Sequence, residues 1–150
     1  MNEQPGRAEA EQEQEEPRHG DHFLQILVNL ANRGMSFGLT IATGGLLVTG
    51  TLVSGNEYFD GFAREFASMI QGTKAKKTVD ELFARFSKEW QLHREEDEAQ
   101  GEVSPLPHFM HLKNARILHA GTTIPTNRGV WWRGRLDAID GFTLGEMSKP

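Results

Sequence analysis

The stretch FGLTIATGGLLVTGTLVS, residues 37–54, carries the signals that decide the expected fold. Large and small residues alternate over residues 37–43, which is the period of a half-buried strand. Gly44 and Gly45 form a tight turn, and residues 46–54 are apolar and β-branched enough for a second strand. Gly50 lies inside that second strand, where glycine favours a bulge or a sharp bend. The stretch therefore predicts a bent antiparallel hairpin.

A helix is expected on the N-terminal side of this hairpin. Asp21 is a candidate N-cap, because a short acidic side chain can accept a hydrogen bond from the first turn. Apolar residues then recur at helical spacing from Phe23 to Ala31, and Gly34 closes the segment. The order predicted so far is a helix followed by two strands.

Two further helices are expected after the hairpin. The first begins near Glu57 and ends at Gly72, with four apolar residues on one helical face: Phe59, Phe62, Phe66 and Ile70. A basic connector, residues 73–77, follows it. Thr78 and Glu81 have the spacing of a capping box, which predicts the start of the second helix. The acidic residues 92–107 are expected to form a flexible loop after this helix.

The C-terminal third contains three segments that indicate strands, namely residues 108–118, 130–136 and 139–147, with a loop at 119–129. The predicted fold class is α+β: about five bent antiparallel strands, an N-terminal helix, and a two-helix insertion between the second and third strands. The pattern leaves open whether the sheet stays open or closes into a small Sm-like or SH3-like barrel.

Length and composition predict one folded domain. The 150 residues suffice for a single core, expected over residues 21–147. Residues 1–20 hold six Glu and two Arg and are expected to be a disordered acidic tail. The N-terminus shows no signal peptide pattern, and the longest apolar stretch, residues 39–53, is too short to cross a bilayer. The absence of cysteine excludes disulfides and thiol nucleophiles.

The candidate binding surface is basic and aromatic. The net charge is −5, yet the stretch 113–135 holds five basic residues and no acid. Alternation along residues 130–136 places Trp132 in the core and turns Trp131 outward beside two arginines, a composition typical of interfaces with protein or stacked bases. The alternative is that a helix covers Trp131. The candidate residues are Lys113, Arg116, Arg128, Trp131, Arg133 and Arg135.

Catalytic and metal sites are not expected. The sequence holds no Gly-x-Ser-x-Gly, Walker loop or His-Glu-x-x-His motif. His108, His111 and His119 are close in sequence, but residues three apart on a strand face opposite sides, so we expect ordinary exposed or half-buried histidines. Asp137 and Asp140 are expected to flank a turn. The sequence thus predicts a protein without catalytic residues, metal or cofactor.

Three blocks, taken in order, resemble the gas vesicle accessory protein GvpU family: residues 38–62, 108–118 and 131–147. The specific parts are the Gly-Gly hairpin followed by Gly-Thr-Leu-Val-Ser, the run His-Leu-Lys-Asn-Ala-Arg, and Trp-Arg-Gly before Asp-Gly-Phe. The resemblance extends over residues 21–147, and the stretch 71–106 matches poorly. The acidic tail does not match the family.

The resemblance implies a cytoplasmic, non-enzymatic protein at the gas vesicle surface. Such a protein is expected to bind the shell protein and to promote vesicle clustering by self-association, as a homo-oligomer or a condensate, without a membrane partner. The basic and aromatic strand would contact an acidic or apolar shell segment, and the acidic tail and loop would compete for it or mediate self-association. The alternative is an oligomeric Sm-like barrel that binds RNA or an acidic partner, although the mildly basic domain disfavours nucleic acid.

Overall fold

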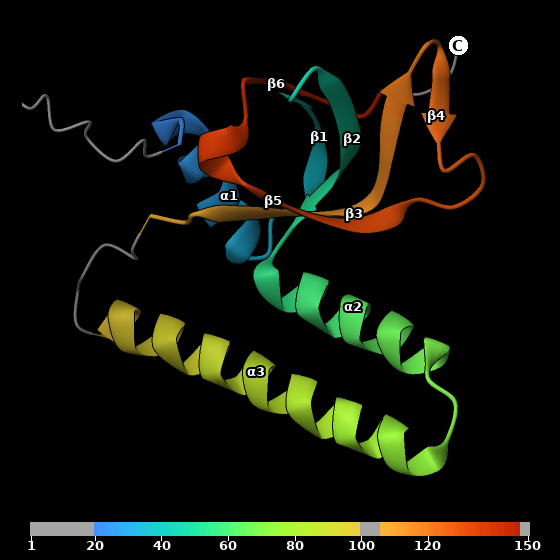
Figure 1. Cartoon of the computed structure of the whole chain (residues 1–150). Coiled ribbons are helices and arrows are strands. Elements are labelled where there is room, and N and C mark those ends of the chain that lie inside the picture. Colours follow the sequence, from blue (N-terminus) through green and yellow to red (C-terminus); the bar gives the residue numbers. More distant parts are fainter. Residues whose placement is uncertain (1–19, 100–105, 148–150) are drawn as a thin grey trace, which may run out of the picture.

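The computed structural model describes residues 20–99 and 106–147, with the backbone alone for residues 92–94 and 96–99 (Figure 1). The chain has the predicted α+β composition. Its elements, in chain order, are α1 (His22–Asn32), β1 (Phe37–Thr43), β2 (Leu46–Val53), α2 (Gly55–Met69), α3 (Thr73–Ala99), β3 (Phe109–His119), β4 (Thr122–Ile124), β5 (Val130–Arg135), a short 3-10 turn (Leu136–Ala138) and β6 (Gly141–Leu144).

The strands form one antiparallel sheet in the order β4-β3-β2-β1-β6, with β5 paired to β3. The long strand β3 pairs with β5 through its first half and with β4 through its last three residues. The sheet has six strands rather than about five, because β4 lies inside the stretch expected as a loop. It does not close into a barrel, so the Sm-like or SH3-like alternative is wrong for this fold.

Two irregular positions bend the sheet, and one of them was predicted. The register of β2 against β3 shifts between Thr49 and Thr51, so Gly50 lies at the expected bulge. A Cβ atom at Gly50 would lie 3.0 Å from the carbonyl oxygen of Lys113, which explains the glycine. Asn114 has a positive φ of 52° where the pairing of β3 with β5 shifts. These irregularities let the two halves of β3 take different neighbours.

The main core lies between α1 and one face of the sheet. The carboxylate of Asp21 accepts a hydrogen bond from the backbone N–H of Leu24 at 2.9 Å, which confirms the predicted cap. Trp132 packs partly buried against this core, as its place in the strand predicted. The fully or nearly fully buried side chains are Leu24, Val28, Ala31, Leu39, Ile41, Val48, Leu52, Met110, Leu112, Ala115 and Leu136.

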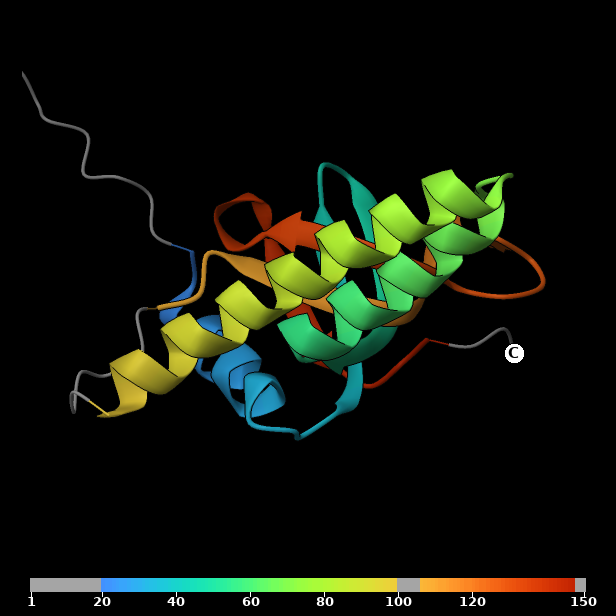
Figure 2. The ribbon, with the colours of Figure 1, turned by 90° about the horizontal axis from the view of Figure 1, so that it is seen from below.

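A helical hairpin covers part of the sheet on its other side. Helix α2 lies between the sheet and α3, as the two perpendicular views show (Figures 1 and 2). The Ser54 hydroxyl caps α2 by accepting from the N–H of Glu57 at 3.1 Å. A second apolar cluster joins Val53 to Tyr58 and Phe59, with Trp90 and Trp131 packed against it. The hairpin is thus anchored to the sheet through aromatic side chains.

The boundaries of α3 correct two predictions. The helix begins at Thr73, and the Thr78 hydroxyl donates to the carbonyl of Lys74 inside it, so the predicted capping box is wrong. The helix continues to Ala99, so residues 92–99 are helical rather than a flexible loop. The Leu, Arg, Glu and Ala residues in this stretch have high helix propensity, which outweighs the repulsion between neighbouring acids. The predicted disorder of residues 1–19 and the loop at 100–105 lie outside the described residues.

Candidate interaction surface

Strand β5 carries half of the predicted binding residues, and β3 is its one partner among the described strands. Its tryptophan Trp131 faces the helical hairpin, where its ring meets Tyr58 edge-on at a centroid distance of 6.0 Å. A Cβ atom at Gly61 of α2 would lie 1.9 Å from this indole, so the glycine makes room for the ring. Of the two alternatives that the sequence left open for Trp131, cover by a helix is confirmed, because α2 lies over the ring.

Arg133 ties β5 to its surroundings. Its Nε donates a hydrogen bond to Nε2 of His111 at 3.2 Å, across the β3–β5 pairing. Its guanidinium lies 3.7 Å from the ring centroid of Phe109, a cation–π contact, and 5.9 Å from that of Phe59. The residue remains exposed as a whole. Arg133 thus serves the packing of the site as much as it adds positive charge.

His111 is the residue that sequence reasoning placed wrongly. It is 2% exposed, and its ring lies 4.6 Å from that of Tyr58 and 5.4 Å from that of Phe59. Burial and, to a smaller extent, the nearby charge of Arg133 together lower the pKa of His111 to about 3. The neutral ring can accept the Arg133 hydrogen bond through Nε2. The missing signal is that both faces of β3 are covered, which the sequence does not show.

The pKa of His111 predicts a loss of stability in mild acid. Because its folded pKa lies below the value of 6.5 for a free histidine, the unfolded chain takes up a proton that the folded chain refuses. The stability that depends on neutral His111 is fully present above pH 6.5. Between pH 6.5 and pH 3 the free energy of unfolding falls by up to about 1.4 kcal/mol per pH unit. We expect His111→Gln to flatten the slope of unfolding free energy against pH between about pH 6 and pH 4. Equal slopes for the two proteins, measured by urea unfolding, would contradict this prediction.

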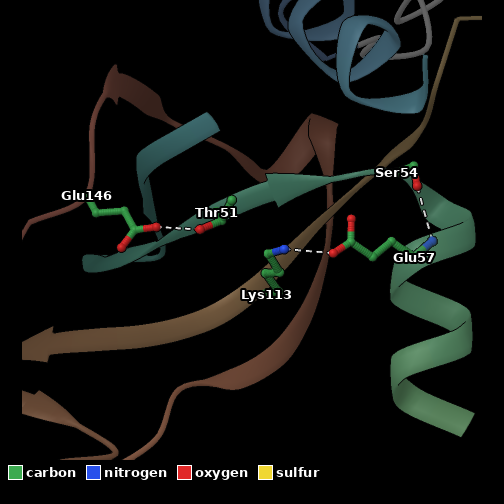
Figure 3. A network of polar contacts seen from close by, with 5 residues as sticks. All are labelled: Thr51, Ser54, Glu57, Lys113 and Glu146. Atoms are coloured by element: carbon green, nitrogen blue, oxygen red, sulfur yellow. Dashed lines mark hydrogen bonds and ion pairs between the residues drawn. The ribbon is translucent and has the colours of Figure 1, made fainter. Parts of the chain in front are cut away.

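Two of the predicted cations are held by other residues. Nζ of Lys113 lies 2.7 Å from Oε1 of Glu57, so this lysine joins β3 to the start of α2 (Figure 3). Nearby, Thr51 donates to Glu146, which links β2 to the segment after β6 (Figure 3). Arg116 donates to the backbone carbonyl of Asn127 at 3.1 Å and thereby holds the loop between β4 and β5. Both side chains are half-buried and support the fold.

The two remaining arginines are accessible: Arg128 lies in the loop two residues before β5, and Arg135 is the last residue of the strand. Arg135 has a side chain that is 66% exposed, with Nε 3.4 Å from a carboxylate oxygen of Asp137. Arg128 is exposed, and no side-chain hydrogen bond or ion pair to another described residue is found for it. Seven positions separate these two arginines along the chain, which limits the distance between their Cα atoms to at most roughly 25 Å. The six predicted residues thus form two basic ends joined by a strand, rather than one continuous patch.

The other residues considered from the sequence are Asp140 and the histidines His108 and His119. Asp140 accepts a hydrogen bond from the N–H of Gly44 at 3.2 Å, and so secures the hairpin turn. His108 and His119 are exposed and lie near opposite ends of β3. Within residues 20–99 and 106–147, no group of three or more potential metal ligands was found. None of the described helices combines the length and apolar character needed to cross a bilayer.

Comparison with known proteins identifies one related family. A family model described as gas vesicle protein GvpU-like matches residues 21–147, which confirms the resemblance seen in the three sequence blocks. No similar protein was found among the curated proteins. None was found among the solved structures.

Proposed function

The chain belongs to the GvpU-like family of gas vesicle proteins, and on this premise we propose that it binds the protein shell of gas vesicles and promotes their clustering by self-association. In this proposal it acts without catalysis, in the cytoplasm, at the vesicle surface. The observation that carries the proposal is the pair of exposed guanidinium groups, Arg128 and Arg135, at the two ends of β5.

Charge and rigidity support a docking role for β5. Guanidinium groups bind carboxylates in defined geometry. Arg135 is carried by β5, a strand that the sheet and α2 hold in place, and Arg128 lies in the loop just before this strand. The stretch 113–135 contains no acidic residue, and the one carboxylate found beside these two arginines among the described residues is that of Asp137, 3.4 Å from Arg135. An acidic segment of a shell protein laid along β5 would meet a basic group at each end. The charged partner makes the contact sensitive to salt.

Clustering requires more than one shell contact in each assembly. A single weak contact per molecule decorates a vesicle, whereas an oligomer that presents several contacts can hold two vesicles together. The acidic residues 1–20 are a candidate competitor for the β5 arginines within the same chain. Competition of this kind would let salt set both shell binding and self-association.

Flotation tests the proposal. Purified protein is mixed with isolated gas vesicles from which bound proteins have been stripped, and the vesicles are floated at low and at high salt. We expect the protein to float with the vesicles at low salt and to be released at high salt. Protein that stays on the vesicles at high salt would indicate that aromatic side chains of the helical hairpin, rather than the arginines, contact the shell. Failure to float at either salt would contradict shell binding, and absorbance at 260 nm would then test the RNA-binding alternative.

A further inference from the structure

One side of the β5 backbone has no partner in the described part of the chain. The pairing of β5 with β3 sets Arg135 opposite Phe109. The next residue, Leu136, donates its N–H to the carbonyl of His108 at 2.9 Å. In an antiparallel pair, the backbone groups of successive residues point to opposite sides of the strand. The N–H and C=O groups of Arg133 and Arg135 therefore point away from β3, and they form what we call the free edge of β5.

Nothing found in the described residues blocks this free edge. An unpaired edge is a template for another strand unless proline, a bulge or a covering segment prevents the pairing. Strand β5 contains no proline. The register shift against β3 lies beyond Leu112, towards Val130, and leaves the Arg133 end of the strand regular. Helix α2 contacts β5 through the ring of Trp131, which stands on a face of the sheet and not at its edge.

The charge of the free edge selects the kind of strand that can be added. Arg133 and Arg135 are exposed, and because they are two residues apart their side chains share one face of the strand. A second copy of β5 would bring the arginines of two chains together, and like charges on paired strands are destabilising. The contacts with His111 and Asp137 use the Nε atom of each arginine, so the other guanidinium N–H groups remain for a ligand.

We propose that an extended acidic segment of the shell protein adds to the free edge of β5 as a further strand, with carboxylates at alternate positions. Backbone hydrogen bonds with Arg133 and Arg135 would hold the segment, and two carboxylates on one face would lie opposite the two guanidinium groups. Arg128, just before the strand, extends the basic row. The inference rests on the proposed shell binding and assigns to it a geometry that charge attraction alone does not supply.

The substitution Arg135→Pro separates the backbone contact from the charge. Arg135 has a φ of −78°, which proline adopts, and its N–H is not used by the sheet, so we expect the fold to be kept. Arg135→Ala is the matched control, because it removes the same charge and keeps the N–H. Both full-length variants are floated with stripped gas vesicles at low salt. We expect Arg135→Pro to bind at least fivefold more weakly than Arg135→Ala, since proline removes a donor and its ring obstructs an added strand.

Hydrogen exchange of the unmodified chain gives a second test, read by mass spectrometry on residues 130–136. We expect the N–H groups of Arg133 and Arg135 to exchange rapidly in the free protein and at least tenfold more slowly with stripped vesicles in excess. Strand β6, at the opposite edge of the sheet, is the internal control and is expected to keep its exchange rates.

The outcomes separate the strand addition from shell binding itself. Equal binding of Arg135→Pro and Arg135→Ala, or unchanged exchange in protein that floats with the vesicles, would overturn the strand addition and leave shell binding in place. Protection of the same N–H groups in concentrated protein without vesicles would assign the free edge to a second copy and overturn the shell segment as its ligand. A wild type that does not float would overturn the proposed function, and the strand addition with it.

Discussion

Replacement of Gly61 by alanine is expected to destabilise the fold by about 2 kcal/mol, because the new methyl group would overlap the ring of Trp131. Alanine is otherwise favoured over glycine inside a helix by about 1 kcal/mol, so a loss here has to come from the contact. For a chain of this size, a change of 2 kcal/mol corresponds to a fall of roughly 6 °C in Tm.

The control for this prediction is the same Gly61→Ala substitution in a variant that lacks the Trp131 ring. In a chain that already carries Trp131→Ala, the ring is gone, and Gly61→Ala is expected to be neutral or to stabilise by up to about 1 kcal/mol. Thermal unfolding of the four proteins gives the coupling between the two sites. An equal cost of Gly61→Ala in both backgrounds would show that α2 does not cover Trp131.

Charge reversal of Arg128 and Arg135 is expected to weaken shell binding at least tenfold at low salt. The double substitution Arg128→Glu with Arg135→Glu places carboxylates at both ends of β5, where they repel an acidic partner. Because both residues are exposed, the unfolding free energy is expected to change by less than about 1 kcal/mol. Arg133 is unsuitable for this test, since it holds His111 and Phe109.

Local signals in the sequence predicted much of the sheet and α1. Asp21 caps α1 because capping depends only on residues in the next turn. Gly50 marks a bulge because a side chain there would press against the neighbouring strand. Trp132 reaches the core because alternation along a strand is fixed by the backbone. Each of these features depends on residues close together in the sequence or on the pairing of two neighbouring strands.

Features that depend on distant segments were left open or predicted wrongly. The sequence left open whether a helix covers Trp131, and it did not predict the burial of His111, because α2 covers both residues and no pattern within β3 or β5 indicates this cover. The accessible cations could not be separated from the engaged ones, because Lys113 meets Glu57 only after α2 packs on the sheet.

Binding of Arg128 and Arg135 to the gas vesicle shell is tested most directly by flotation. Stripped vesicles are floated at low salt with the wild type, with Arg128→Glu/Arg135→Glu, and with the charge-matched control Arg33→Glu/Arg64→Glu. We expect the wild type and the control to rise with the vesicles and the Arg128→Glu/Arg135→Glu variant to stay in solution. Equal flotation of all three proteins would contradict shell binding through these two arginines.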